Sequence, residues 1–309
     1  SLRRRQRQMC IRDSFVVPGL NSIDLAGNIA SRLGCRIASV YRKQFPDGEL
    51  YVRIGERVSK SVVVIVNSFY PRQNSSIIET LLLVNAVRYM NAYRIIAVIP
   101  YLAYSRQDKI FMDGEPVSIE AILKSLKACG VDYLLTVDLH NPLSLKYFGE
   151  HGYNIMVSDL LVKKALDYLE KPIVLAPDKG ALERASYAAK ELGLEYDYLV
   201  KRRDRVSGKV SLEPKEINVS GRDVVIVDDI ISTGGTIALA SKKCLESGAN
   251  RVVVAATHSL LIGSALEKIM DAGVYKLITT NSISLSIGEG FIEIVDLSER
   301  IAEAVKNIV

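Results

Sequence analysis

Cysteine is scarce in this chain, and its four cysteines form no recognisable pattern. Cys10, Cys35, Cys129 and Cys244 lie far apart in the 309-residue sequence, and no C-x-x-C pair is present. This spacing argues against a zinc site and against a disulfide framework. A reducing, cytoplasmic setting is the interpretation that fits such cysteine usage best.

Long hydrophobic runs are also missing from the sequence. The apolar runs are short, at 62–66, 95–99, 224–227 and 252–256, whereas a membrane-spanning helix needs ~18 or more apolar residues in succession. We therefore expect no membrane partner. The composition, 49% hydrophobic and 24% charged, is typical of an ordered protein that is long enough for two domains.

The charge of the chain gives little support to a nucleic-acid partner. The formal net charge is +5, but the first fourteen residues contribute +4 of it, with five arginines against one aspartate. This arm has no apolar segment, so it does not resemble a secretory signal. We expect residues 1–14 to be a non-native basic extension, and we expect no nucleic-acid binding.

Short β-branched runs alternate with amphipathic segments of helical length, and the alternation starts again after residue 155. The pairs in chain order are 62–66 with 76–90, 95–99 with 118–129, 173–175 with 181–192, 224–227 with 237–247, and 252–256 with 264–272. Apolar strands that alternate with helices predict mainly parallel sheets flanked by helices. We therefore predict an α/β protein with domains at 15–155 and 156–309, whose last helix, 298–309, could pack on either domain.

Polar clusters follow the predicted strands at 95–99, 133–137, 173–175 and 224–227. They are SRQDK at 105–109, DLHN at 138–141, PDKG at 177–180 and DDIISTGGT at 228–236. Ligands of open α/β sheets bind beyond the carboxyl ends of the strands. We therefore expect these clusters to form binding sites. No P-loop and no Ser-His-Asp pattern accompanies them.

The last of these clusters carries the most specific chemistry. Asp228 and Asp229 follow four β-branched residues, and carboxylates accept hydrogen bonds from vicinal hydroxyls such as a ribose diol. The turn into the next helix consists of Ser232, Thr233, Gly234, Gly235 and Thr236. Backbone N–H groups at such a turn bind an anion, so the stretch suits a ribose phosphate. The alternative is that the hydroxyls only cap the helix and the aspartates are solvated.

The motifs together resemble those of a known enzyme family. Residues 224–236 are similar to the phosphoribosyl-diphosphate (PRPP) motif of type I phosphoribosyltransferases and of ribose-phosphate pyrophosphokinases. FPDGE at 45–49, SRQDK, DLHN, PDKG and KRR at 201–203 occur in the order seen in the pyrophosphokinases, and the archaeal type is the more similar. The resemblance covers essentially the whole chain after residue 14.

The resemblance implies two phosphoribosyltransferase-like domains, an ATP side at 15–155 and a ribose 5-phosphate side at 156–309. It also implies a Mg²⁺-dependent kinase of nucleotide biosynthesis. Such an enzyme transfers the β,γ-diphosphoryl group of ATP to the 1-hydroxyl of ribose 5-phosphate and gives PRPP and AMP. Residues 228–229 and 232–236 would then bind ribose 5-phosphate.

The resemblance places ATP on Arg106, Gln107 and Asp108 and places Mg²⁺ on His140 and Asp178. From the residues alone, Arg106 and Asp108 could equally form a surface ion pair. Mg²⁺ prefers oxygen ligands, so chemistry alone would not select His140, and Asp178 could simply cap the next helix. Many family members have a second glycine where this chain has Ala181.

Two further groups take their roles from the resemblance. Phe45, Asp47 and Glu49 would reach the ATP of a neighbouring copy, so that the ATP site is shared across a dimer interface of a homo-oligomer. On their own they predict only a hairpin turn at Pro-Asp-Gly. Lys201 and Arg203 would be catalytic cations on a flexible loop, whereas a charged run is otherwise a solvated face of a hairpin.

Two other functions share part of this pattern. A phosphoribosyltransferase would have the 224–236 motif but would need only one such domain. A non-catalytic regulatory homologue would be expected to lack the histidine or the Lys-x-Arg pair, and both are present. One departure concerns the ribose-phosphate loop itself, because many family members have Asp where this chain has Ser232.

Overall fold

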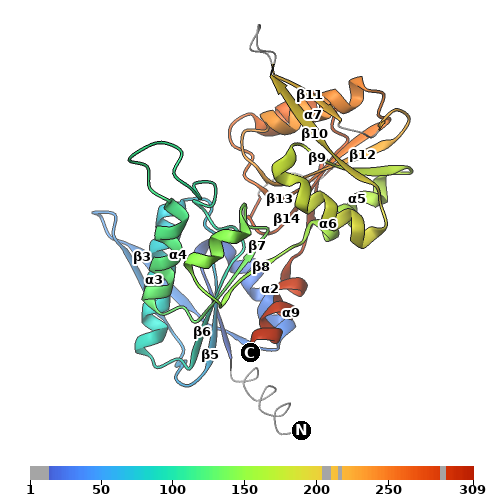
Figure 1. Cartoon of the computed structure of the whole chain (residues 1–309). Helices are drawn as coiled ribbons and strands as arrows, with labels where there is room; N and C mark the ends of the chain where they lie inside the picture. The colour runs from blue at the N-terminus through green and yellow to red at the C-terminus, as the bar shows by residue number, and fades with distance from the viewer. Residues whose placement is uncertain (1–13, 204–209, 215–217, 286–289) are drawn as a thin grey trace. The chain divides into compact units, whose positions relative to one another are not determined.

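A computed structural model of the chain describes residues 14–203, 210–214, 218–285 and 290–309, with the backbone alone for 201–203 and 210–214. Its contacts divide the chain into two compact units (Figure 1). The first contains the described residues up to Ile155 together with Ser282–Ser284 and Leu297–Val309, and the second contains Met156–Asn281 and Leu285–Asp296. Most of the expected basic extension lies outside the described residues.

The first unit is built on a six-stranded parallel sheet with the order β2-β1-β5-β6-β7-β8, beside a separate two-stranded hairpin, β3-β4. Its elements are β1 (Phe15–Pro18), η1 (Leu20–Ser22), α2 (Ile23–Leu33), β2 (Arg36–Ile37), β3 (Val40–Gln44), β4 (Leu50–Ile54), β5 (Val62–Val66), α3 (Gln73–Tyr89), β6 (Arg94–Ile99), α4 (Ser118–Cys129), β7 (Tyr133–Val137), η2 (Pro142–Tyr147), β8 (Gly152–Ile155) and α9 (Ser298–Ile308).

The second unit has a seven-stranded sheet with the order β11-β10-β9-β12-β13-β14-β15, in which only the β10–β11 pair is antiparallel. Its elements are α5 (Ser158–Ala165), η3 (Leu166–Tyr168), β9 (Pro172–Ala176), η4 (Lys179–Ala181), α6 (Leu182–Leu192), β10 (Tyr196–Arg203), β11 (Val210–Pro214), β12 (Asp223–Ile231), α7 (Gly235–Glu246), β13 (Arg251–Ser259), α8 (Ala265–Asp271), β14 (Lys276–Thr280) and β15 (Ile292–Val295). Two mainly parallel sheets flanked by helices confirm the predicted fold class.

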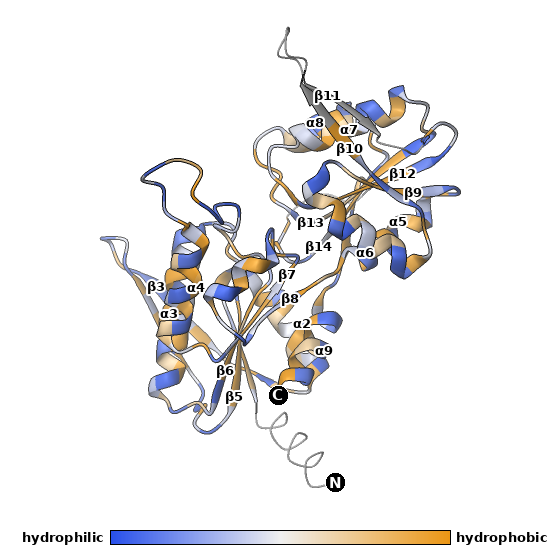
Figure 2. Ribbon diagram, in the orientation of Figure 1, coloured by the Kyte–Doolittle hydropathy of each residue, from blue (hydrophilic) through white to orange (hydrophobic). Residues whose placement is uncertain are grey.

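The central strands form the core of each unit because helices cover both of their faces. Every residue of β5 is buried, and the strands are hydrophobic while polar residues gather on the outer sides of the helices (Figure 2). In the second unit, Val225 and Val227 of β12 pack against α5 and α6. Val224 and Ile226 pack toward α7 and α8. Among the described residues, no helix is long and apolar enough to cross a membrane.

The last helix, α9, packs against α2 in the first unit. Arg32 Nε donates to Ser298 Oγ at 2.8 Å, and Lys306 Nζ donates to the carbonyl oxygen of Arg32 at 3.1 Å. The side chains of Ile301, Ala302 and Val305 are buried. The amphipathic pattern alone left the partner of this helix open, and these polar contacts at both ends of α9 fix it on α2.

One strand boundary differs from the expectation in a way that matters for the site. We expected the strand before Asp228 to end at Val227, but β12 continues to Ile231. The reason is its neighbour β13, which pairs with β12 as far as Ile231 and Ser259. The two aspartates therefore lie within a strand and not after it. The next helix also starts earlier than expected, at Gly235.

Candidate active site

The acidic pair lies at the carboxyl end of the second sheet. On one side of β12, the pairing with β9 ends at Ile226, two residues before Asp228. On the other side, β13 still pairs with Asp228 through Ala256. Strand β12 thus extends past the end of its pairing with β9, while β13 still supports it. This arrangement gives the two carboxylates a rigid backbone at the edge where ligands of parallel sheets bind.

The loop after β12 leads into a helix whose first N–H groups have no side-chain cap. The N-cap of α7 is Gly234, which has no side chain that could cap the helix. The carbonyl oxygen of Ser232 accepts from Ile262 N at 2.9 Å. The first backbone N–H groups of α7 are therefore not capped by the side chain of the N-cap residue, and the N-terminus of α7 can receive an anion.

Gly234 is required at its position for two reasons. Its φ is +76°, in the left-handed region, and a Cβ there would lie 2.8 Å from the carbonyl oxygen of Ala265. The loop thus packs directly on the start of α8. Gly235, by contrast, has nothing within 4 Å of its Cβ direction, so that face of the helix start is open. Thr233 and Thr236 are exposed beside it.

The electrostatics of the acidic pair involve a third residue that the sequence analysis did not single out. Burial raises the pKa of Asp228 well above its usual range, and the neighbouring Asp229 raises it further. Arg184 of α6 acts in the opposite direction, and its Nη2 lies 3.4 Å from Asp229 Oδ2. Asp228 Oδ1 also accepts from the backbone N–H of Asp229 at 2.9 Å.

Asp178 lies just beyond β9, the strand next to β12. Its Oδ1 accepts from Gly180 N at 2.8 Å, so it caps the 3-10 helix η4, as one of the two interpretations of this residue expected. A carboxylate has lone pairs on both oxygens, so this capping bond is compatible with a second role as a metal ligand. Ala181, the departure from the family pattern, is buried at the end of η4.

Lys201 and Arg203 lie on β10 near its antiparallel partner. The backbone of Lys201 pairs with Leu212 and that of Arg203 with Val210, which confirms a hairpin at this place. The side chains of these two residues and residues 204–209 lie outside the described part of the chain.

In the first unit, two of the predicted clusters are joined. Asp108 Oδ2 accepts from Asn141 Nδ2 at 2.6 Å, which links the loop after β6 to the loop after β7. His140 is exposed next to Asn141, and Arg106 is exposed in the first loop. Gln107 accepts a hydrogen bond from Ser118 at the start of α4. The loops that carry the proposed ATP and metal residues thus meet at one end of the sheet.

The turn 45–49 forms the tip of the β3–β4 hairpin. Phe45 N donates to Glu49 O at 2.8 Å, and Glu49 N donates to Asp47 Oδ1 at 3.1 Å. Phe45 contacts Tyr51 edge to face at a centroid distance of 6.2 Å. Phe45, Asp47 and Glu49 are all exposed, and the hairpin extends away from the sheet of its own unit (Figure 1).

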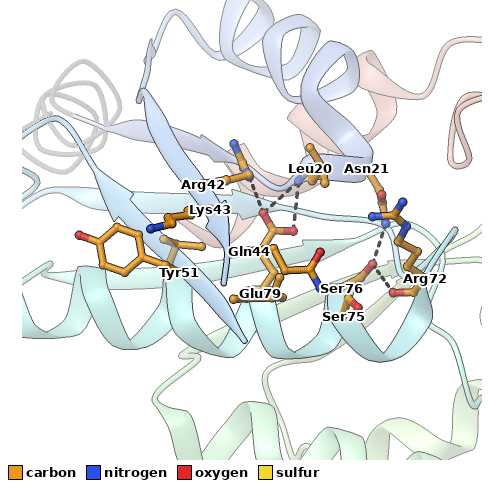
Figure 3. A pocket seen from close by; sticks show the side chains of 12 residues that line it. Leu20, Asn21, Arg42, Lys43, Gln44, Tyr51, Arg72, Ser75, Ser76 and Glu79 are labelled. Atoms are coloured by element: carbon orange, nitrogen blue, oxygen red, sulfur yellow. Dashed lines mark hydrogen bonds and ion pairs between the residues drawn. The ribbon is translucent and has the colours of Figure 1, made fainter. Parts of the chain in front are cut away.

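A buried ion pair holds the base of this hairpin against α3. Arg42 Nε lies 2.5 Å from Glu79 Oε1, and Glu79 also accepts from Leu20 N and from Asn67 Nδ2. Arg42 and Glu79 line a cavity of about 390 Å³ between the hairpin and α3, with Tyr51 at one end and Arg72 at the other (Figure 3). The hairpin is therefore held at its base while its tip is exposed.

Comparison with known proteins first shows the class of protein to which this chain is similar. Residues 15–130 match the family described as the N-terminal domain of ribose phosphate pyrophosphokinase, and residues 153–284 match the phosphoribosyl transferase domain. The crystal structure of phosphoribosylpyrophosphate synthetase from Mycobacterium smegmatis superposes with a TM-score of 0.87 at 26% identity, and the match covers 96% of this chain and 98% of that one.

Curated relatives narrow the assignment of the chain to one enzyme family. The ribose-phosphate pyrophosphokinase of Pyrococcus furiosus is 44% identical over 82% of this chain and 89% of its own length. That of Sulfurisphaera tokodaii is 40% identical over 82% of this chain and 88% of its own length. This chain belongs to the ribose-phosphate pyrophosphokinase family. The archaeal resemblance predicted from the motifs is confirmed.

Proposed function

We propose that this chain transfers the β,γ-diphosphoryl group of ATP to the 1-hydroxyl of ribose 5-phosphate, giving PRPP and AMP for nucleotide synthesis. The observation that carries the proposal is the end of β12. Two carboxylates suited to a ribose diol stand there next to the N-terminus of α7, which has no side-chain cap. Family membership supplies the reaction, and this geometry supplies a place for its acceptor substrate.

On the ribose side, Asp228 and Asp229 accept hydrogen bonds from the sugar hydroxyls. The 5-phosphate lies on the loop and on the first N–H groups of α7, where the helix dipole favours an anion. The loop residues are Ser232, Thr233, Gly234, Gly235 and Thr236. Serine at position 232 can donate to phosphate, although it cannot supply the carboxylate that many family members have there.

On the nucleotide side, Arg106, Gln107 and Asp108 bind ATP. Arg106 clamps phosphate oxygens, and the bond between Asp108 and Asn141 fixes this loop beside His140. Phe45, Asp47 and Glu49 bind the adenine of a neighbouring copy, with Phe45 stacked on the ring. The exposed hairpin tip on a fixed base supports this assignment, because a residue that serves a neighbour must extend from its own unit.

Mg²⁺ is the cofactor that the family implies. The described residues hold no cluster of three or more His, Cys, Asp or Glu side chains that could bind a metal alone. This fits Mg²⁺, which usually takes one or two protein ligands and completes its shell with substrate phosphates and water. Asp178 and His140 would each supply a protein ligand for Mg²⁺. When bound, the ion neutralises and orients phosphate oxygens of ATP.

The chain's residues contribute mainly position and charge. The 1-hydroxyl oxygen forms a bond to the β-phosphorus while the bond from that phosphorus to the α,β-bridging oxygen breaks. The hydroxyl proton passes to solvent, and AMP leaves with the bridging oxygen. Lys201 and Arg203 stabilise the negative charge that develops on the transferred group. No dedicated general base is required, because alignment of the reactants supplies much of the rate.

Asp228→Asn tests the ribose side. The amide offers one acceptor oxygen where the carboxyl group of Asp228 offers two. Leaving a sugar hydroxyl without its partner costs enough that we expect the KM for ribose 5-phosphate to rise about tenfold or more. The KM for ATP should stay within about twofold. Steady-state AMP formation measures both, with Asp271→Asn at the exposed end of α8 as control. An unchanged KM for ribose 5-phosphate in Asp228→Asn would exclude Asp228 as a ligand of the ribose.

A further inference from the structure

Arg184 is a buried cation in the first turn of α6. The side chains of Arg184 and Asp229 are 8% and 6% exposed, and the atoms Nη2 and Oδ2 lie 3.4 Å apart. The carbonyl oxygen of Arg184 accepts from Ser158 Oγ at 3.0 Å, which fixes this turn against the start of α5. The contact thus joins a fixed helical turn to the strand that carries the acidic pair.

The register of β12 explains why this arginine reaches the second aspartate. Side chains alternate between the two faces of a strand, and Val225 and Val227 pack with Ala185 on the α6 side. Asp229 continues this face, where Arg184 lies. Asp228 is the preceding residue of β12, and its Oδ1 accepts from the backbone N–H of Asp229 at 2.9 Å. Arg184 therefore fixes Asp229 from α6, and because the backbone N–H of Asp229 donates to Asp228, the contact bears on both members of the acidic pair.

Local stability does not account for an arginine at this place. The N-terminal turn of a helix carries partial positive charge, so a cation there is unfavourable. Burying an ion pair costs desolvation that its attraction often fails to recover, and well-packed apolar residues are frequently as stable. The position is otherwise an apolar one, because Ala185, Ala188 and Ala189 form the buried face of α6. The ion pair therefore points to a role for the charge itself.

We propose that Arg184 is a positioning residue for ribose 5-phosphate, which keeps Asp229 ionised and fixed so that the acidic pair accepts the hydrogen bonds of the sugar hydroxyls. Adjacent buried carboxylates otherwise tend to share a proton. A protonated carboxyl uses one of its oxygens as a donor and loses acceptor capacity for a diol. This inference rests on the proposed role of Asp228 and Asp229 in ribose 5-phosphate binding.

Arg184→Gln is the direct test. The KM for ribose 5-phosphate should rise about tenfold or more, as expected when hydrogen bonds to a charged group are weakened. The kcat and the KM for ATP should change by less than about threefold, and Arg184→Lys should recover most of the affinity because it restores the charge. The control is Arg222→Gln, which removes the ion pair with Glu195 at the other end of β12 and should leave the KM unchanged.

A second comparison applies if Arg184→Gln does not fold because Asp229 has lost the cation beside it. The double variant Arg184→Gln/Asp229→Asn removes both charges, and its KM for ribose 5-phosphate should equal that of Asp229→Asn alone. A further rise of tenfold in the double variant would overturn the proposal, since Arg184 would then act other than through Asp229. A folded Arg184→Gln with an unchanged KM would overturn it equally.

The KM of Asp229→Asn for ribose 5-phosphate distinguishes an error in the proposed ribose site from an error in the proposed role of Arg184. If Asp229→Asn and Asp228→Asn both leave the KM for ribose 5-phosphate unchanged, the proposed ribose site is wrong. If Asp229→Asn raises the KM and a folded Arg184→Gln does not, the site stands and only the role of Arg184 is wrong.

Discussion

Lys201→Ala should reduce kcat more than about tenfold while the KM for ATP changes little, because the cation acts mainly on charge that develops in the transition state. The transferred diphosphoryl group passes from one oxygen to another with its charge spread over the equatorial oxygens. A cation on the β10–β11 hairpin would contribute most at that point. Steady-state AMP formation with ATP and ribose 5-phosphate varied separately gives the required constants.

The matched control for this prediction is Lys190→Ala. Lys190 is an exposed cation of the same unit, on α6, and its removal should leave kcat and both KM values unchanged. A normal kcat in Lys201→Ala would remove Lys201 from the mechanism. A rise in the KM for ATP with kcat retained would assign the residue to ground-state binding instead.

Gly234→Ala should both destabilise the protein and abolish most ribose 5-phosphate binding. A side chain in left-handed backbone costs about 1–2 kcal/mol, and here the Cβ would also lie 2.8 Å from the Ala265 carbonyl oxygen. The backbone of the loop must then shift away from α8, and the N–H groups of α7 lose their alignment. Thermal unfolding and calorimetric titration with ribose 5-phosphate measure the two effects.

Gly193→Ala separates backbone strain from displacement of the loop. Gly193 has a φ of +68° at the end of α6, but nothing lies within 4 Å of a Cβ built there. This control should lose about 1–2 kcal/mol of stability from the same backbone strain and should bind ribose 5-phosphate normally. If Gly234→Ala also binds normally, the loop at 232–236 is not the phosphate site.

The sequence predicted the architecture because the fold depends on patterns that are local. β-branched runs such as 62–66 are buried strands, and Gly248 follows α7 with a φ of +89°, as a glycine after a helix end should. The end of β12 could not be predicted in this way. Its last residues are held by hydrogen bonds to β13, which is a non-local contact, so the acidic pair appeared to follow the strand.

Arg184 is a residue of the site that single sequence motifs do not identify. It lies four residues before Ala188 and next to Ala185, on the face of α6 that is buried. A charge on the apolar face of an amphipathic segment is a signal that could have been found. Its partner, however, is on a strand 45 positions further along the chain, and only the folded structure brings the two together. The bond between Asp108 and Asn141 is a similar case.

The most direct test of the account is a phosphorus NMR time course of the full-length protein with ATP, Mg²⁺ and ribose 5-phosphate. We expect AMP and PRPP to appear together and only when all three are present. ADP in place of AMP would mean transfer of the γ-phosphoryl group alone and would contradict the proposed reaction. Bound nucleotide without any turnover, also after removal of residues 1–14, would contradict it as well and would favour a regulatory homologue.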